Sequence, residues 1–167
     1  MNGNAVSIPL DGRHRYAVRV YYEDTDAGGV AYHATYLRFA ERARTEALRD
    51  LGIPHAELLQ RFTLMFVVRR IEVDYLRPAR LDDSLTVVTE PLAVGGASML
   101  LRQELQGPVG SCAVLTVRLA CVSPGEERPG RLPQRWRTTL TTMCKAARGP
   151  EQAELRRGSR WIGQSMR

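Results

Sequence analysis

The strongest constraint on the fold is one long amphipathic helix that precedes a nearly unbroken series of strand-like segments. Through residues 33–51, apolar side chains recur at the spacing of an α-helix, at Tyr36, Ala40, Ala43, Ala47 and Leu51. Gly52 and Pro54 then end the helix. Several residues of the stripe are alanine, so we expect another layer to pack closely against it. The length and the single buried stripe suit a helix covered by a sheet.

The remaining segments of the body read as strands. β-Branched and aromatic residues are concentrated in five stretches, 16–22, 62–76, 85–92, 98–105 and 111–122. A short turn of helix is expected at residues 54–60, before the second stretch. The order of strand, long helix and four strands predicts an antiparallel sheet built from consecutive hairpins. One face of this sheet would be covered by the helix, and the other would be open to water.

The length of 167 residues is enough for one domain with a real core. We expect a flexible leader at 1–15, the folded domain at 16–127, a short helix within 128–148 and a basic, disordered tail at 149–167. Residues 1–127 hold 14 arginines against 16 acidic residues, whereas residues 128–167 hold 10 basic residues against 2 glutamates. Because the excess of basic residues lies outside the body, the composition does not indicate a nucleic-acid-binding domain.

The sequence predicts a cytoplasmic protein without a metal centre. No run approaches the roughly 18 uncharged apolar residues of a membrane span. The N-terminus lacks the basic, apolar and small-residue order of a signal peptide. Cys112 and Cys121 lie nine residues apart on one expected strand and so point to opposite faces, which predicts reduced thiols. No cysteines and histidines have the spacing of metal ligands.

The candidate site is the loop of residues 22–33, which joins the first strand to the long helix. Asp24 and Asp26 flank a single residue, so in an extended loop one can stabilise structure while the other points into a cleft. Gly28 and Gly29 allow close approach to a ligand. The free N–H groups of the helix start can bind an oxyanion. A carboxylate nucleophile or base opposite such an oxyanion hole is the smallest set of groups that acyl transfer needs. An ordinary strand-to-helix turn explains the same residue types.

These residues resemble those of a known family in two blocks that keep their order and spacing. The first comprises residues 21–30, 32–33, 36–38 and 41–46, and the second comprises residues 66–70, 75 and 78–83. Both look like the signature of the YbgC-like acyl-CoA thioesterases, bacterial proteins of the Tol–Pal-associated branch of the 4-hydroxybenzoyl-CoA thioesterase-like hotdog family. The resemblance covers about residues 16–122.

The resemblance implies an α+β hotdog fold, in which an antiparallel β-sheet wraps around one long central helix. It implies hydrolysis of acyl-CoA thioesters without metal or organic cofactor, by subunits that form homodimers or homotetramers. The family's catalytic aspartate falls on Asp26, and its oxyanion-binding N–H falls on His33. The residues expected to contact the substrate are Gly29, Val30, Tyr32, Tyr36, Arg69 and Arg70.

One departure from the family concerns the phosphates of CoA. The 4-hydroxybenzoyl branch carries consecutive basic residues in a hairpin turn, where this chain has Gly95-Gly96-Ala97. One possibility is that another arginine binds the phosphates, and the candidates are Arg69, Arg70, Arg77 and Arg80. The others are that the pantetheine is held less tightly, or that acyl carrier protein is the natural donor. The sequence leaves all three open.

Several alternatives accompany this interpretation. Glu41 on the helix is a second candidate carboxylate, although an ion pair with Arg44 is the expected structural role. A hotdog hydratase would carry His-Phe-Pro-Gly, whereas His33 is followed by Ala-Thr-Tyr. The other alternative is a non-catalytic module of the cell envelope that binds an acyl group, acyl carrier protein or another protein. His14 and His55 are expected at the surface.

Overall fold

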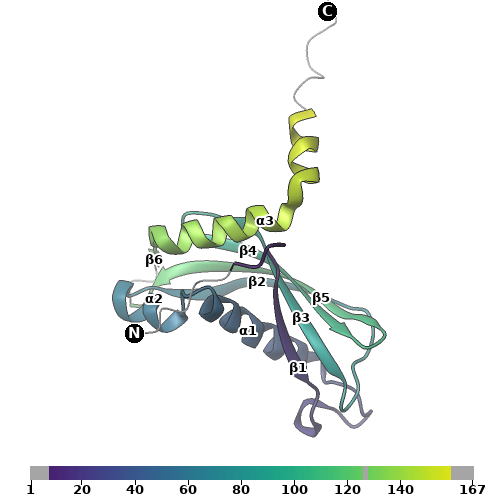
Figure 1. The fold of residues 1–167 in the computed structure, drawn as a ribbon. Coiled ribbons are helices and arrows are strands. Elements are labelled where there is room, and N and C mark those ends of the chain that lie inside the picture. The colour runs from purple at the N-terminus through teal and green to yellow at the C-terminus, as the bar shows by residue number, and fades with distance from the viewer. Residues whose placement is uncertain (1–7, 126–127, 159–167) are drawn as a thin grey trace, which may run out of the picture.

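The computed structural model describes residues 8–125 and 128–158, and it consists of an antiparallel sheet curled around one long helix (Figure 1). The order of the predicted elements indicated an antiparallel sheet with a helix on one face, and the family resemblance implied that the sheet wraps around this helix. The first seven residues of the expected leader and the last nine of the expected tail lie outside the described residues. The division of the chain into leader, domain, helix and tail therefore stays a prediction.

The helices and strands follow the predicted segments closely. In chain order they are β1 His14–Arg19, the 3-10 turn η1 Tyr22–Asp24, α1 His33–Asp50, α2 His55–Phe62, β2 Met65–Tyr75, β3 Ser84–Val94, β4 Ser98–Gly107, β5 Gly110–Ser123, β6 Arg128–Pro129 and α3 Gln134–Gly158. β1 starts and ends earlier than expected. Its early end follows from η1, which begins at Tyr22. α3 is longer than the expected helix, and it contains a break at Gly149, whose φ is 60°.

The strand order is β1-β3-β4-β5-β2, and β6 pairs with β5. The prediction of consecutive hairpins was therefore wrong for β2 and β3, which are not neighbours because β4 and β5 lie between them. Residues 76–83 connect these two strands. Hairpin loops usually have two to five residues, and neighbouring strands lie only about 4.8 Å apart, so this longer connection can cross the end of the sheet. As a result, β2 is an edge strand beside β5.

The core lies between α1 and the inner face of the sheet. Alternate residues of the central strands point toward α1 and are buried, including Leu101, Gln103 and Leu105 of β4 and Leu115, Val117 and Leu119 of β5. The alanines of the α1 stripe are also buried. The outer face carries charged residues, among them Arg118 and the ion pair between Arg102 and Glu104. This contrast between the faces agrees with one covered and one hydrated side.

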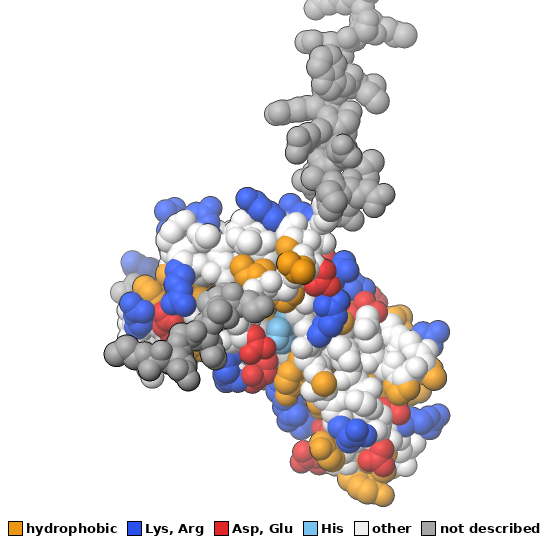
Figure 2. All heavy atoms as spheres, in the orientation of Figure 1, with side chains coloured by type: hydrophobic (Ala, Val, Ile, Leu, Met, Phe, Trp, Pro, Cys, Tyr) orange, Lys and Arg blue, Asp and Glu red, His pale blue; other side chains and the backbone are white. Residues whose placement is uncertain are grey.

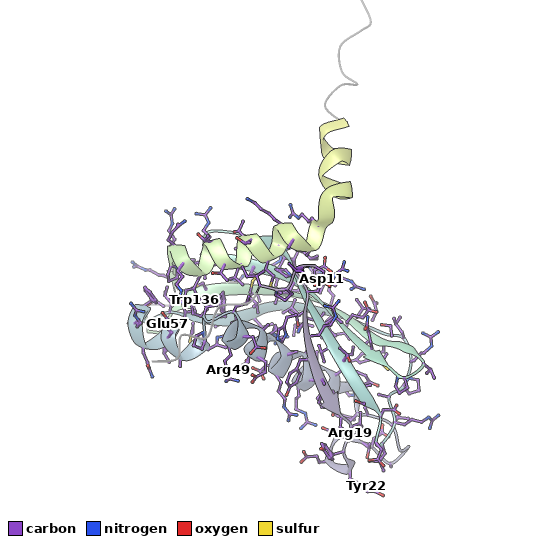
Figure 3. The ribbon with its side chains drawn as sticks, in the orientation of Figure 1. Asp11, Arg19, Tyr22, Arg49, Glu57 and Trp136 are labelled. Atoms are coloured by element: carbon purple, nitrogen blue, oxygen red, sulfur yellow. The ribbon has the colours of Figure 1, made fainter. Side chains whose placement is uncertain are left out.

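α3 packs across the sheet and extends the same core (Figure 1). Trp136 points from α3 into the molecule, where its ring lies 6.2 Å from that of Phe66 (Figure 3). Basic side chains lie along the outer side of α3 (Figure 2). Within residues 8–125 and 128–158, no helix is both long and apolar enough to cross a membrane.

We expect Trp136→Ala to lower the free energy of unfolding by about 3–5 kcal/mol, because it removes a fully buried indole and leaves a cavity. Urea denaturation followed by circular dichroism measures the change. Trp136→Phe is the control and should cost much less, since the indole N–H is buried without a hydrogen-bond partner among the described residues. A loss below about 1 kcal/mol for Trp136→Ala would show that α3 contributes little to the core.

Candidate active site

Asp24 stabilises the loop that precedes α1 from inside the protein. Its side chain is almost completely buried, and its Oδ2 accepts a hydrogen bond of 3.0 Å from the Tyr21 N–H. Its backbone oxygen accepts bonds from the Tyr32 N–H at 2.8 Å and from Thr35 Oγ1 at 3.1 Å. The guanidinium of Arg38 lies 3.7 Å from Oδ1. Asp24 thus joins η1 to the first turn of the helix.

Asp26 lies on the opposite side of the loop and is exposed to solvent. Its Oδ1 accepts a bond of 2.8 Å from the Gly28 N–H, while its backbone N–H and oxygen bond to Val30 and Gly29. Gly29 has a φ of 72°, which a residue with a side chain would adopt only with strain. The two carboxylates therefore differ as an extended loop predicts, with Asp24 inside and Asp26 outside.

The start of α1 presents an N–H group for an anionic oxygen. His33 is the first residue of the helix, and no hydrogen bond found within the described ranges uses its backbone N–H. The hydroxyl of Tyr75 donates a bond of 2.9 Å to the carbonyl of the same residue. An antiparallel bridge between Thr25 and Ala31 folds the loop back toward this helix start. Figure 3 labels Tyr22 at this end of the molecule.

An open groove of about 270 Å³ lies beside the helix start. His33 and Tyr36 line it from α1, and Tyr75 and Arg77 line it from β2 and the connection that follows. Tyr36 is buried, its hydroxyl accepts a bond from the Ala79 N–H at 2.9 Å, and its ring meets that of Tyr75 edge to face. Burial raises the pKa of Tyr36, so the phenol is neutral at physiological pH.

These groups suit acyl transfer at a carbonyl carbon. An exposed carboxylate can act as nucleophile or base, and a free helix N–H can stabilise the developing oxyanion. In the part of the chain that the structure describes, no three His, Cys, Asp or Glu residues are grouped to hold a metal ion. Burial raises the pKa of Cys121 to about 11, so this thiol is a poor nucleophile at neutral pH.

Comparison with known proteins shows the family to which the chain belongs. Residues 28–111 match the Thioesterase superfamily. The chain belongs to this superfamily. An acyl-CoA thioesterase YbgC from Haemophilus influenzae is 48% identical over 125 residues, which are 75% of this chain and 92% of that protein. The resemblance predicted from the sequence is thereby confirmed.

A second relative and a solved structure extend the comparison. An acyl-CoA thioester hydrolase YbgC from Escherichia coli is 44% identical over 72% of this chain and 90% of its own length. The crystal structure of a probable thioesterase from Bartonella henselae matches with a TM-score of 0.69 and 38% identity, over 72% of this chain and 99% of that one. The hotdog fold of this thioesterase-superfamily protein is confirmed.

The structure brings most of the predicted site residues to one end of the molecule. Gly29 lies in the turn with Asp26, and Val30 forms an antiparallel bridge with Arg80. The ring of Tyr32 lies 4.2 Å from that of His33, and both side chains are exposed. Tyr36 lines the groove. Their part in binding a thioester stays a prediction.

Arg69 and Arg70 lie elsewhere on β2. The register of β2 against β5 shifts between Val68 and Arg70, so Arg69 lies in a bulge. Arg70 pairs with Arg118 in the register, on the outer face of the sheet, and its guanidinium lies 2.5 Å from the carboxylate of Glu72. Neither arginine lines the groove beside His33.

Tyr75 was not among the predicted site residues, whereas Arg77 was one of the four arginines considered for the CoA phosphates, and both line the groove. The alternation of Ile71, Val73 and Tyr75 along β2 is a signal that Tyr75 shares the face that packs on α1. No local pattern marks Arg77, because it follows the strand in an irregular connection. Only the folding of that connection against the helix start places it there.

The expected ion pair between Glu41 and Arg44 was wrong. Glu41 instead accepts a bond of 3.0 Å from Thr45 Oγ1. Arg44 points to the sheet and donates a bond of 2.8 Å to Oε1 of Gln103. Burial lowers the pKa of Arg44, although the nearby Glu41 carboxylate acts in the other direction. A buried polar partner on β4 thus determines the direction of this side chain.

The expected surface positions of two histidines were also wrong. His14 is buried, and its Nε2 lies 2.9 Å from Oδ2 of Asp50 at the end of α1. His55 is half-buried, and this burial lowers its pKa. His14 faces inward because it lies on β1 opposite Thr89, whose side chain is also buried. Both histidines have polar neighbours in the sequence, and such neighbours are typical of exposed segments, so nothing in the sequence indicated that these side chains are buried or half-buried.

We expect Asp24→Ala to lower the free energy of unfolding by about 1–3 kcal/mol, because it removes a nearly buried carboxylate that accepts a hydrogen bond from the Tyr21 N–H and lies 3.7 Å from the Arg38 guanidinium. Asp26→Ala should change it by only about 0.5 kcal/mol, since that side chain is exposed. Thermal and urea denaturation of the two variants give the comparison. A larger loss for Asp26→Ala than for Asp24→Ala would contradict the assignment of Asp24 as the structural carboxylate.

Proposed function

We propose that this protein hydrolyses acyl-CoA thioesters to a free acid and CoA, with Asp26 as the working carboxylate and the His33 N–H as the oxyanion donor. The observation that carries the proposal is the contrast between a buried Asp24, which holds the loop, and an exposed Asp26 beside a helix start with a free N–H. The relatives named as acyl-CoA thioesterases support the substrate class.

The reaction needs two contributions from these groups. The thioester oxygen accepts a hydrogen bond from the His33 N–H, which stabilises the negative charge of the tetrahedral intermediate. Asp26 either attacks the carbonyl carbon, to form an anhydride that water then opens, or takes a proton from the attacking water. In both routes the carbon–sulfur bond breaks, and the CoA thiolate leaves and is protonated. The water oxygen enters the product acid when water attacks the acyl carbon, and it enters the Asp26 carboxylate when water attacks the Asp26 side of the anhydride.

The groove beside His33 supplies the surroundings of the thioester. Tyr75 donates to the His33 carbonyl at 2.9 Å and so holds the peptide unit of the helix start. The ring of Tyr32 packs against that of His33, and the ring of Tyr36 meets that of Tyr75 at the groove. Of the four arginines considered for the CoA phosphates, Arg77 lines this groove. We therefore assign Arg77 to phosphate binding, a role that serves acyl-CoA and the phosphopantetheine of acyl carrier protein equally.

The free edge of β2 supports the predicted assembly into dimers. β2 has 11 residues and pairs with β5 on one side, while Met65 and Val68 are exposed apolar residues. A long exposed edge with apolar side chains favours pairing with another strand. We propose a homodimer in which the two β2 strands pair antiparallel about a two-fold axis, with homotetramers as a further step. The cytoplasmic location stays a prediction.

Asp26→Asn keeps the shape of the side chain and removes its charge, so we expect turnover to fall by roughly a hundredfold or more. Thiol release from a series of acyl-CoA substrates measures turnover, and calorimetry with a non-hydrolysable thioether should show little change in affinity. Asp24→Asn should reduce turnover much less, and Glu41→Gln should give an intermediate effect. If Asp26→Asn retains most of its turnover while Glu41→Gln abolishes it, the helix glutamate is the catalyst.

The proposed dimer predicts that activity depends on assembly. Sedimentation at assay concentrations should give a dimer or a larger even-numbered species, because a monomer would leave the edge of β2 uncovered. On dilution below the dissociation constant, specific activity should fall together with the dimer fraction. A stable monomer that keeps full specific activity would exclude an active site shared between subunits.

A further inference from the structure

α3 lies beyond the segment that matches the family, and its surface is strongly basic. The family match ends at residue 111, whereas α3 begins at Gln134. Residues 131–148 include five basic side chains and no acidic one. All five are exposed, namely Arg131, Arg135, Arg137, Lys145 and Arg148. Figure 2 shows basic side chains gathered along the outer side of this helix.

The two faces of α3 have different roles. Trp136, Leu140 and Met143 recur at helical spacing and are buried in the core. The exposed positions between the basic residues of the helix are polar, namely Gln134, Thr138 and Thr142. Because the apolar face is already used in the core, the helix cannot turn it toward a partner. Up to residue 148, its outer face therefore offers positive charge without a large apolar side chain.

Neighbouring carboxylates leave most of this charge uncompensated. Arg135 lies 3.3 Å from the carboxylate of Glu57. Within residues 8–125 and 128–158, the other four basic residues form no ion pair. Glu90 is the acidic residue of β3, the strand on which α3 packs, and it pairs with Arg13 instead. The outer face of α3 is thus a cationic surface.

This surface lies at the end of the molecule away from the groove beside His33. The Leu132 N–H donates a bond of 2.8 Å to the Gly96 carbonyl, which places the start of α3 beside the hairpin between β3 and β4. β3 leads from the connection that lines the groove to this hairpin, and its 11 residues span roughly 35 Å. A surface bound to α3 would therefore leave the groove of the same chain open.

We propose that the outer face of α3 binds a membrane surface that contains anionic phospholipids. Cations held on one side of a rigid helix complement a plane of headgroup phosphates, and each cation near such a surface tightens binding by about fivefold. The attachment is peripheral and electrostatic, because the apolar side of the helix is buried in the protein and cannot enter the hydrocarbon. This inference goes beyond the proposed function and does not depend on it.

Two features of the helix favour a lipid surface over a nucleic acid. Up to residue 148, the outer face of α3 has no exposed aromatic side chain on which bases could stack. This part of α3 also lies along the sheet, so it does not project as a helix that enters a major groove does (Figure 1). A planar array of phosphates needs no such projection.

The sequence after α3 agrees with a lipid partner. It carries Arg160-Trp161-Ile162, and tryptophan beside basic residues is typical of the boundary between membrane and water. These three residues lie outside the described part of the chain. The proposal therefore rests on the outer face of α3.

The first experiment measures sedimentation of the full chain with phosphatidylcholine vesicles, with or without about 30% phosphatidylglycerol. The protein should bind only the anionic vesicles. Binding should be lost between about 0.1 and 1 M salt, because the Debye length falls from about 10 to 3 Å. The double variant Arg137→Gln, Lys145→Gln should bind about tenfold more weakly or worse. The matched control is Arg42→Gln, Arg49→Gln, which removes two exposed charges from α1 and should change binding by less than about threefold.

Three results would overturn the proposal. Equal binding to both kinds of vesicle would show that the anionic headgroups have no part. An equal loss of binding in the α1 control would assign the attraction to the net charge of the chain, rather than to α3. Tighter binding to single-stranded RNA or duplex DNA than to the anionic vesicles, at the same salt concentration, would make nucleic acid the partner.

The second experiment locates the contact through Lys145, which is the one lysine of the chain. An amine-reactive acetylating reagent therefore labels no other lysine side chain, and mass spectrometry of the peptide measures the rate. Anionic vesicles should slow acetylation of wild type by about fivefold or more, and phosphatidylcholine vesicles should leave it unchanged. Unchanged reactivity of Lys145 in vesicle-bound protein would place the contact on another face and overturn the proposal.

Discussion

Close contact between α1 and the inner face of the sheet is the constraint on which the rest of the structure depends. Ala40, Ala43 and Ala47 are buried along this contact, so the helix can lie near the strands without large side chains between them. The curled sheet can therefore wrap closely around α1 (Figure 1). The groove lies at the first turn of the helix, and a second cavity lies beneath its later turns.

Polar groups inside this contact determine how the helix lies on the sheet. Gln103 is completely buried, and its amide N–H groups donate to the Ala40 carbonyl and to Thr89 Oγ1, both at 2.9 Å. Its carbonyl oxygen accepts from Arg44 at 2.8 Å. Because a buried polar group without a partner costs about 1–3 kcal/mol, a shifted or rotated helix would be disfavoured. The network thus adds orientation to a contact that is otherwise apolar.

The same division between inside and outside explains the loop before α1. Asp24 uses its buried carboxylate to join η1 to the helix start, which leaves Asp26 on a well-ordered turn with its carboxylate in solvent. Such an arrangement holds a reactive group in position without burying its charge. The proposed pairing of subunits would then enclose a carboxylate that a single chain leaves open.

The sequence by itself determined the long helix, the strands and the loop that carries Asp26 and His33, because periodicity and turn residues are local properties of the chain. The family blocks also identified the fold, since residues of matching type recur there in matching order. The tertiary structure alone decided that β2 pairs with β5, because strand pairing joins residues far apart in sequence. For the same reason, only the folded chain shows Arg44 turned to Gln103, His14 buried at Asp50, and Tyr75 and Arg77 beside His33.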